Sequence, residues 1–539
     1  MWEELGSEFE VLHSSAGRLH DDPKPSKLRS DATRRAFGFI FGPTSIKPVH
    51  IANVVFWHTT GSYANLEVLE QFVKNKKLSH DELEFDSKDW FNGGPRDEEI
   101  KEVGRFMRLL LDNDDGLYVG NSNAPTGTST RLTGYAQGNI RVGRFVYQLL
   151  STADSEYNGQ TISGLRHELE NYTDPMSVLF RPIVGDVDHE SSSTDWSEPL
   201  MDNPLEDEKA GSDLAKGFAT LSQHFNSPRQ EITHYPGDLI RAVKFGCFAL
   251  IVHIANRNEE LQLEYDAPMH ERTGERGRFP ILLNYTADQD RQNRILQTSF
   301  DCFQQLKQEA QQATTIGARA QLAEMEYETD GDSKSLTDYN KSELITLIQN
   351  HNFPDDRNVS EGSTEARDYQ LFASQFRSAA DSSVLDGLTD AYSWALNQNT
   401  FAGNEVYPVQ NGIRNLARRM GLIKPHGNYA KHRWFRPDPS LLETLILSVV
   451  DPEDDSPRIP LTDVCERLKT RYGILVGGTD GERQHLSDWG ISIGSNVSER
   501  GSLDYNYKQF RTELVELGLA RAYADGVTFV YPNQIEANQ

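Results

Sequence analysis

Cysteine is scarce in this chain, and the spacing of the few cysteines excludes two kinds of site. Cys247, Cys302 and Cys465 are the only three among 539 residues, and no Cys-x-x-Cys pair is present. A zinc ribbon needs paired cysteines and a disulfide framework needs a larger, even number, so the sequence supports neither. We therefore expect the protein in a reducing compartment, the cytoplasm.

Long hydrophobic runs are also lacking. The longest, Phe245–Ala255, is too short to cross a bilayer, which takes about 20 apolar residues, and is typical of a buried helix or strand. The N-terminal stretch MWEELGSEFE is acidic and has no apolar core, unlike a secretory signal peptide. We expect no membrane partner.

Nucleotide-binding motifs are missing as well. The chain contains no GxxxxGK[ST] and no GxGxxG after an expected strand. The stretch FGPTSIK, residues 41–47, has only a superficial likeness to a phosphate-binding loop and is better explained as a Gly-Pro turn. We expect no cofactor, and the sequence favours a non-catalytic protein over an enzyme.

Two clusters have the residue types of metal ligands. Asp186–Glu190 reads DVDHE but opens a strongly acidic loop, where carboxylates occur without a metal. His80–Lys88 reads HDELEFDSK, and its Asp86 and Lys88 resemble the Asp-x-Lys ending of a restriction-type nuclease. We assign no metal site, and a metal-dependent nuclease stays open as an alternative function.

What the chain does have is a basic segment inside an acidic protein. The formal net charge is −27, from 54 Lys and Arg against 81 Asp and Glu, yet Val406–Pro437 contains no acidic residue. A local basic surface on an acidic chain points to a specific anionic partner, and double-stranded DNA is the first candidate. The seven cations of the segment are Arg414, Arg418, Arg419, Lys424, Lys431, Arg433 and Arg436.

The order of residues in this segment is that of a winged helix. A helix over Val409–Met420 has apolar residues on one side, and a basic hairpin with aromatic residues follows it. Arginine and asparagine read base edges and grip phosphates. The alternative is that the basic face pairs with acidic groups of this protein or of a partner. The candidate DNA-binding residues are Asn411, Arg414, Asn415, Arg418, Arg419, Lys424, Lys431, His432, Arg433 and Arg436.

The patterns along the chain predict a helix-rich, multidomain α+β protein that ends in tandem winged-helix-like units. Residues 1–185 form an N-terminal α+β domain, 186–212 an acidic linker, 213–325 a helical domain with a strand, 326–368 a polar linker, 369–437 the first, basic winged-helix-like unit, and 438–539 the second such unit with an insertion. Within them we expect two strands over 34–60, a strand at 279–285, a long helix from 288 that Gly317 interrupts, and helices over 214–225, 384–396, 461–472 and 505–517.

A sequence pattern that occurs twice in the C-terminal region, an internal echo, supports the tandem arrangement. Two helices end at a Gly-Leu pair, at Gly421 and at Gly518, where glycine adopts left-handed backbone angles cheaply. Each is followed by a short hairpin, and Asp525–Gly526 is a strong two-residue hairpin signal in the second. In the second unit the helix carries Lys508 and Arg511 beside two glutamates, so we interpret it as a packing module.

The C-terminal region, from FRPDPSLLETLILSVV through RLKTRYG to the final hairpin, resembles the C-terminal part of large accessory proteins in bacterial multi-gene anti-phage and DNA-modification-linked defence clusters. The resemblance implies a non-catalytic DNA-sensing or scaffold subunit that works beside a helicase or other ATPase, a nuclease or a methyltransferase. A transcription regulator is a further alternative. The residues that carry the likeness are Leu441, Leu442, Leu445, Leu468, Arg471, Tyr472 and Gly473.

Overall fold

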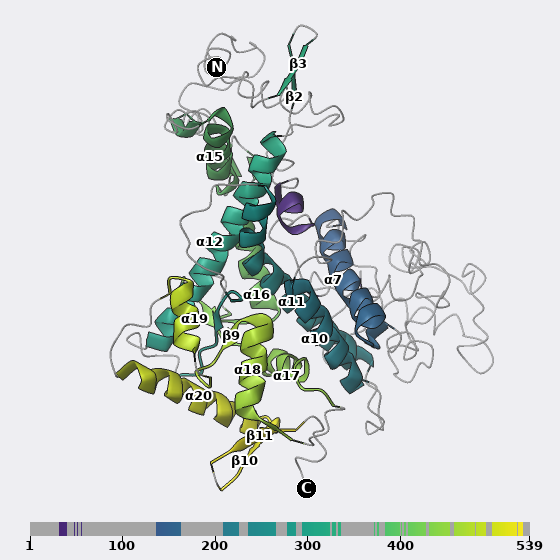
Figure 1. Ribbon diagram of the computed structural model, residues 1–539, viewed down its shortest axis with the longest axis vertical. Helices are drawn as coiled ribbons and strands as arrows, with labels where there is room; N and C mark the ends of the chain where they lie inside the picture. The colour runs from purple at the N-terminus through teal and green to yellow at the C-terminus, as the bar shows by residue number, and fades with distance from the viewer. Residues whose placement is uncertain are drawn as a thin grey trace, which may run out of the picture. The chain divides into compact units, whose positions relative to one another are not determined.

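A computed structural model of the chain describes about half of its residues, and every structural statement below concerns these (Figure 1). The possible metal or nuclease residues Asp86, Lys88 and Asp186–Glu190 lie outside them. The described residues are 32–39, 48, 51, 55, 136–162, 209–225, 235–265, 277–286, 294–323, 326–329, 332–335, 371, 374–376, 383–398, 400–401, 404–405, 408–426, 431–452, 458–479, 481–491, 498–524 and 526–531.

The described chain is helix-rich with small sheets, as the sequence predicts. The helices are α7 (Ala136–Glu156), α10 (Lys209–Phe225), α11 (Tyr235–Glu264), α12 (Arg294–Ala323), α15 (Val384–Leu396), α16 (Val409–Arg419), α17 (Pro439–Leu447), α18 (Leu461–Tyr472), α19 (Glu482–Asp488) and α20 (Ser498–Glu516). The strands are β1 (Ile281–Leu282), β2 (Glu326–Thr329), β3 (Asp332–Ser335), β4 (Thr400–Phe401), β5 (Asn404–Glu405), β6 (Ile423–Lys424), β7 (Trp434–Phe435), β8 (Ile459–Pro460), β9 (Ile474–Leu475), β10 (Ala520–Ala522) and β11 (Thr528–Val530).

The chain divides into two compact units, each assembled from separate stretches. The first comprises Met1–Ser45, His253–Gly274 and Gln305–Asn415, and the second comprises Ile46–Val252, Glu275–Gln304 and Leu416–Gln539. The domain boundaries drawn from the sequence stay a prediction.

In the first unit, buried polar side chains join α11 to α12. The amide nitrogen of Asn258 donates to the Glu309 carboxylate and to the Gln312 amide oxygen, each at 2.7 Å. Glu309 is 1% exposed, and Gln305 donates to its second oxygen at 2.7 Å. Because a buried carboxylate is costly unless it is hydrogen-bonded, these amides fix the two helices in one register.

Two expectations about the first unit are wrong. The described residues 32–37 are helical instead of extended, and Ala32 and Ala36 are fully buried one turn apart. Gly317 does not interrupt α12, which runs on to Ala323. A Cβ at Gly317 would collide with the Ala32 carbonyl, so the glycine permits a close approach to the 32–37 helix.

A hairpin lies at the start of the stretch 326–368, which is expected from the sequence to be a polar linker. Strands β2 and β3 pair antiparallel in the register Glu326↔Ser335 to Thr329↔Asp332. In the sequence, the Asp330–Gly331 pair between these two strands is a strong hairpin signal.

The core of the second unit is an aromatic cluster where α10, α11 and α18 meet. Phe245 of α11 makes edge contacts with Phe218 at 4.6 Å and with Tyr472 at 5.7 Å between ring centroids. Gly217 of α10 lies against both Tyr472 and Phe245, and a Cβ there would collide with them. The apolar run Phe245–Ala255 is thus the buried part of a helix, one of the two structures that the sequence allowed.

The described strands of the second unit form small sheets. Parallel pairing joins β1 to β9, with Ile281 opposite Ile474, and a bridge from Leu283 to Phe435 links them to the β6–β7 hairpin. Asn506 of α20 donates to the carbonyls of Leu283 and Val476 at 2.8 and 3.0 Å, so α20 is held against this sheet. A further sheet has the strand order β10–β11–β8, all antiparallel, and its β10–β11 hairpin is at the bottom of Figure 1.

Candidate nucleic-acid interface

Helix α16 forms because its apolar residues recur at helical spacing. Val409, Ile413, Leu416 and Ala417 are buried, which confirms the helix and its inward side as the sequence predicts them. The polar residues fall on the other side of the helix, where Arg419 is exposed and the rest are half-buried. They are Asn411, Arg414, Asn415, Arg418 and Arg419.

The end of α16 is fixed by a glycine. Gly421 has a φ of +87°, the left-handed conformation expected for a helix C-terminus, and the Leu422 amide donates to the Ala417 carbonyl at 2.8 Å. The Gly421 carbonyl in turn accepts from the Asp438 amide at 2.7 Å. A Cβ on Gly421 would collide with the Asp438 carboxylate, so only glycine allows this approach.

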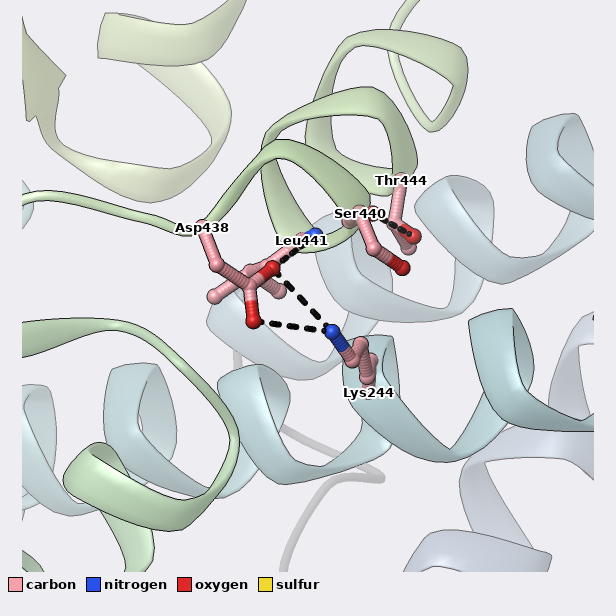
Figure 2. A network of polar contacts seen from close by, with 5 residues as sticks. All are labelled: Lys244, Asp438, Ser440, Leu441 and Thr444. Carbon is pink, nitrogen blue, oxygen red and sulfur yellow. Dashed lines mark hydrogen bonds and ion pairs between the residues drawn. The ribbon is translucent and has the colours of Figure 1, made fainter. Parts of the chain in front are cut away.

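Asp438 follows the basic segment and contacts both Leu441 and Lys244 (Figure 2). Its Oδ1 accepts from the Leu441 amide at 2.7 Å and so caps α17, which begins with Pro439. Lys244 of α11 donates to both carboxylate oxygens of Asp438, at 3.1 and 3.0 Å. One carboxylate therefore joins the start of α17 to α11, while the Ser440 carbonyl accepts from the Thr444 hydroxyl within the first turn.

A second ion pair repeats this connection one turn further on. Arg241 Nη2 of α11 contacts Glu443 Oε1 of α17 at 3.0 Å. Leu441, Leu442 and Leu445 lie at helical spacing in α17, and Asp438 before Pro439 is a helix-start signal. Nothing near Lys244 or Arg241 in the sequence indicates that they hold this helix. Their partners lie 194 and 202 positions further along the chain, respectively.

In the β6–β7 hairpin, one predicted contact residue has a different role. Arg433 is 2% exposed, and its Nη1 donates to the Pro425 carbonyl at 3.1 Å. Arg418 of α16 donates to the neighbouring His426 carbonyl at 3.4 Å. The two guanidinium groups therefore hold the backbone just after β6. Because Arg433 is buried, it is not placed to touch a ligand.

Arg436 is likewise occupied within the protein. Its Nη2 pairs with Glu513 of α20 at 3.2 Å, and its guanidinium lies 5.3 Å from the centre of the Tyr285 ring. Burial raises the pKa of Tyr285 well above its usual value. This contact ties the end of the hairpin to α20, so it fits the alternative in which part of the basic segment pairs with acidic groups of this protein.

Three cations of the segment have no acidic partner among the described residues. They are Arg414 on α16, Lys424 on β6 and Lys431 before β7. Lys431 and His432 are exposed, and the His432 ring lies 5.0 Å from the Phe300 ring. Cations without an acidic partner in the described part of the chain are the groups most available to an external polyanion.

Helix α20 is the counterpart of α16 in the repeated sequence pattern, and its cations are more nearly balanced by acidic residues. Lys508 is exposed and Arg511 is half-buried, while Glu513 faces Arg436. Gly518 ends this helix with a φ of +73°, and the β10–β11 hairpin follows, as the echo in the sequence predicts. The stretch between α18 and α20 holds β9 and α19, and β9 pairs with β1.

Other chemistry finds no support in the described residues. They contain no group of three or more His, Cys, Asp or Glu side chains arranged to hold a metal ion. Burial raises the pKa of the Cys247 and Cys302 thiols to about 12, so both are neutral and poor nucleophiles at physiological pH. Among the described helices, none combines the length and apolar character that crossing a bilayer requires.

Comparison with protein-family models, with curated proteins and with solved structures found no match for this chain.

Proposed function

We propose that this protein is a non-catalytic subunit of a prokaryotic anti-phage defence complex that binds duplex DNA through α16 and the β6–β7 hairpin. The observation that carries the proposal is the acid-free basic segment, whose Arg414, Lys424 and Lys431 have no acidic partner among the described residues. Phosphate contacts by such cations release counterions and favour binding. The defence context and its partner subunits rest on the resemblance of the C-terminal region.

Within this proposal, the ten candidate residues divide into two groups. Arg433 and Arg436 support the hairpin from inside, because the first is buried and the second is paired with Glu513. The outer group would contact phosphates or bases, and it consists of Asn411, Arg414, Asn415, Arg418, Arg419, Lys424, Lys431 and His432.

We further propose that residues 439–531 are a winged-helix-like unit. Support comes from the element order, which is α17, β8, α18, α20, β10 and β11, with a three-stranded antiparallel sheet in the order β8–β11–β10. In this scheme β9 and α19 are an insertion before the last helix. The first winged-helix-like unit expected from the sequence, residues 369–437, shares only the final part of this order, which is a helix that ends in glycine and a hairpin.

The experiment is a mobility-shift titration of duplex DNA with the full-length protein at low salt. Replacing Arg414, Lys424 and Lys431 together by glutamate should lower affinity by at least about tenfold, because each change replaces attraction to phosphate with repulsion. The matched control is Lys508→Glu with Arg511→Glu on α20, which should change affinity little. Equal losses from both sets, or no binding by the native protein, would refute this site.

The nuclease alternative has its own test, since Asp86 and Lys88 lie outside the described residues. Purified protein should neither cut plasmid DNA with magnesium or manganese nor hydrolyse ATP. Metal-dependent nicking that Asp86→Ala abolishes would replace the proposal by the nuclease. Preference for one promoter sequence over other duplexes would favour the transcription regulator.

A further inference from the structure

The three-stranded sheet β10–β11–β8 has an outer face with an unusual composition. Val530 and Ile459 lie opposite each other and are buried, so their neighbours along the strands point outward. Phe529 lies opposite both Arg521 and Pro460, which places all three on one face. We call this the outer sheet face, and its members are Arg458, Pro460, Arg521, Tyr523, Phe529 and Tyr531.

Cations and rings are already organised on the outer sheet face. The Arg458 guanidinium lies 4.7 Å from the centre of the Phe529 ring and 5.7 Å from that of Tyr523. Tyr523 and Phe529 meet edge to face at 5.6 Å, and the hydroxyls of Tyr523 and Tyr531 are hydrogen-bonded to each other. The rings are therefore held in place before any ligand arrives, which lowers the entropic cost of binding.

Every charged residue that the structure describes on the outer sheet face is positive. Arg458 and Arg521 are exposed, and no Asp or Glu occurs among the described residues of β8, β10, β11 and the hairpin ends. Asp525 at the hairpin tip lies outside the described residues. On a chain with a net charge of −27, such a face suits an anionic ligand.

We propose that the outer sheet face binds unpaired nucleotides of single-stranded nucleic acid, with bases stacked on the Phe529, Tyr523 and Tyr531 rings and phosphates held by Arg521 and Arg458. Half-buried rings offer π faces that every base can stack on, and arginines beside them neutralise the backbone. An acidic peptide would use the arginines but not the ring faces, so the aromatic content favours nucleotides. This site is separate from the proposed duplex site and uses none of its residues.

The test is fluorescence anisotropy of labelled oligothymidine and oligouridine with the full-length protein at low salt. Arg521→Ser and Phe529→Leu should each weaken binding by at least about fivefold, the lower end for losing one stacked base. Lys508→Ser is the matched control: it removes one exposed charge from α20 in the same unit and should change binding by less than about twofold. Melting curves identify any variant that fails to fold. If Phe529→Leu does not fold, the binding measured for Arg521→Ser, at an exposed residue, decides the result.

Several outcomes would overturn this site. It fails if the native protein does not bind either oligonucleotide, if Arg521→Ser and Lys508→Ser weaken binding equally, or if polyglutamate displaces the oligonucleotide as well as unlabelled oligothymidine does. The last result would indicate an acidic protein partner. Stronger binding of oligothymidine or of oligouridine separates DNA from RNA as the ligand, and either supports the proposal.

The two proposals fail separately. The triple variant at Arg414, Lys424 and Lys431 should lose duplex binding but keep oligothymidine binding. If duplex DNA never binds while oligothymidine binding depends on Arg521, only the duplex site is wrong. If duplex binding depends on the triple variant and oligothymidine binding is absent, only the outer sheet face is wrong.

Discussion

A single arginine can look like a ligand contact and act as a support. Arg433 lies in a basic, aromatic-rich stretch, which is why the sequence suggests that it touches DNA. In the structure it is buried and donates to the Pro425 carbonyl. A buried guanidinium needs such an acceptor, since an unpaired buried charge costs several kcal/mol, on the order of 3–5. If the hairpin binds a polyanion as proposed, its affinity therefore depends on the arginines that shape it as well as on those that face outward.

Glycine at position 421 has a second role besides ending α16. Gly421→Ala should lower the free energy of unfolding by about 2–4 kcal/mol, because a left-handed alanine costs about 1–2 and collision with the fixed Asp438 carboxylate adds more. Gly518→Ala is the matched control, with a φ of +73° but no atom within 4 Å of the added Cβ. It should cost about 1–2 kcal/mol. Urea denaturation followed by circular dichroism measures both, and equal costs would contradict the crowding argument.

The elements divide clearly into those that the sequence predicts and those that it does not. Helices α15, α16 and α18 were predictable because apolar residues recur over three or more turns, and Asp525–Gly526 indicated the β10–β11 hairpin. The pairing of Ile281 with Ile474 was not predictable from the sequence. Strands of two residues carry no periodic signal, and the two partners are far apart in the chain.

The same contrast holds for the candidate site. The polar side of α16 follows from helical spacing alone, and so does the burial of Ile413 and Leu416 beneath it. The pairing of Arg436 with Glu513 and of Lys244 with Asp438 depends on tertiary contacts between distant segments. Sequence reasoning therefore identifies which cations are present, and the structure is needed to show which of them pair within the protein.

The start of α17 should be more sensitive to substitution than its next turn. Asp438→Ala removes the cap on the Leu441 amide and leaves Lys244 without its carboxylate, so it should cost about 2 kcal/mol of unfolding free energy. Glu443→Ala removes only the pair with Arg241, which is worth about 0–1 kcal/mol. Asp438→Asn keeps an acceptor for the cap and should fall between them. Urea midpoints of the three variants measure the order, and a larger loss from Glu443→Ala would show that the cap is not the important contact.

At the scale of the whole molecule, the net charge sets the conditions under which a polyanion can bind. With −27 charges, the bulk of the protein repels DNA at distances up to the Debye length, about 10 Å at 0.1 M salt. Attraction must come from a few focused cations. Non-specific wrapping is thus disfavoured, and binding through the outer group of the basic segment can be specific for its partner.

This balance makes a quantitative prediction for duplex binding. If Arg414, Lys424 and Lys431 each neutralise one phosphate, they contribute about 2.7 to the slope of log affinity against log salt, at about 0.9 per contact. Replacing the three by glutamine, which removes the charges without adding repulsion, should therefore reduce the magnitude of the slope by about that amount. Arg433→Gln should behave differently: it loosens the hairpin and lowers affinity, but it removes no phosphate contact, so the slope should stay closer to that of the native protein. Anisotropy titrations across a series of salt concentrations give both quantities. A slope that falls as much for Arg433→Gln as for Lys431→Gln would mean that the buried arginine reaches the phosphate after all, through a rearranged hairpin.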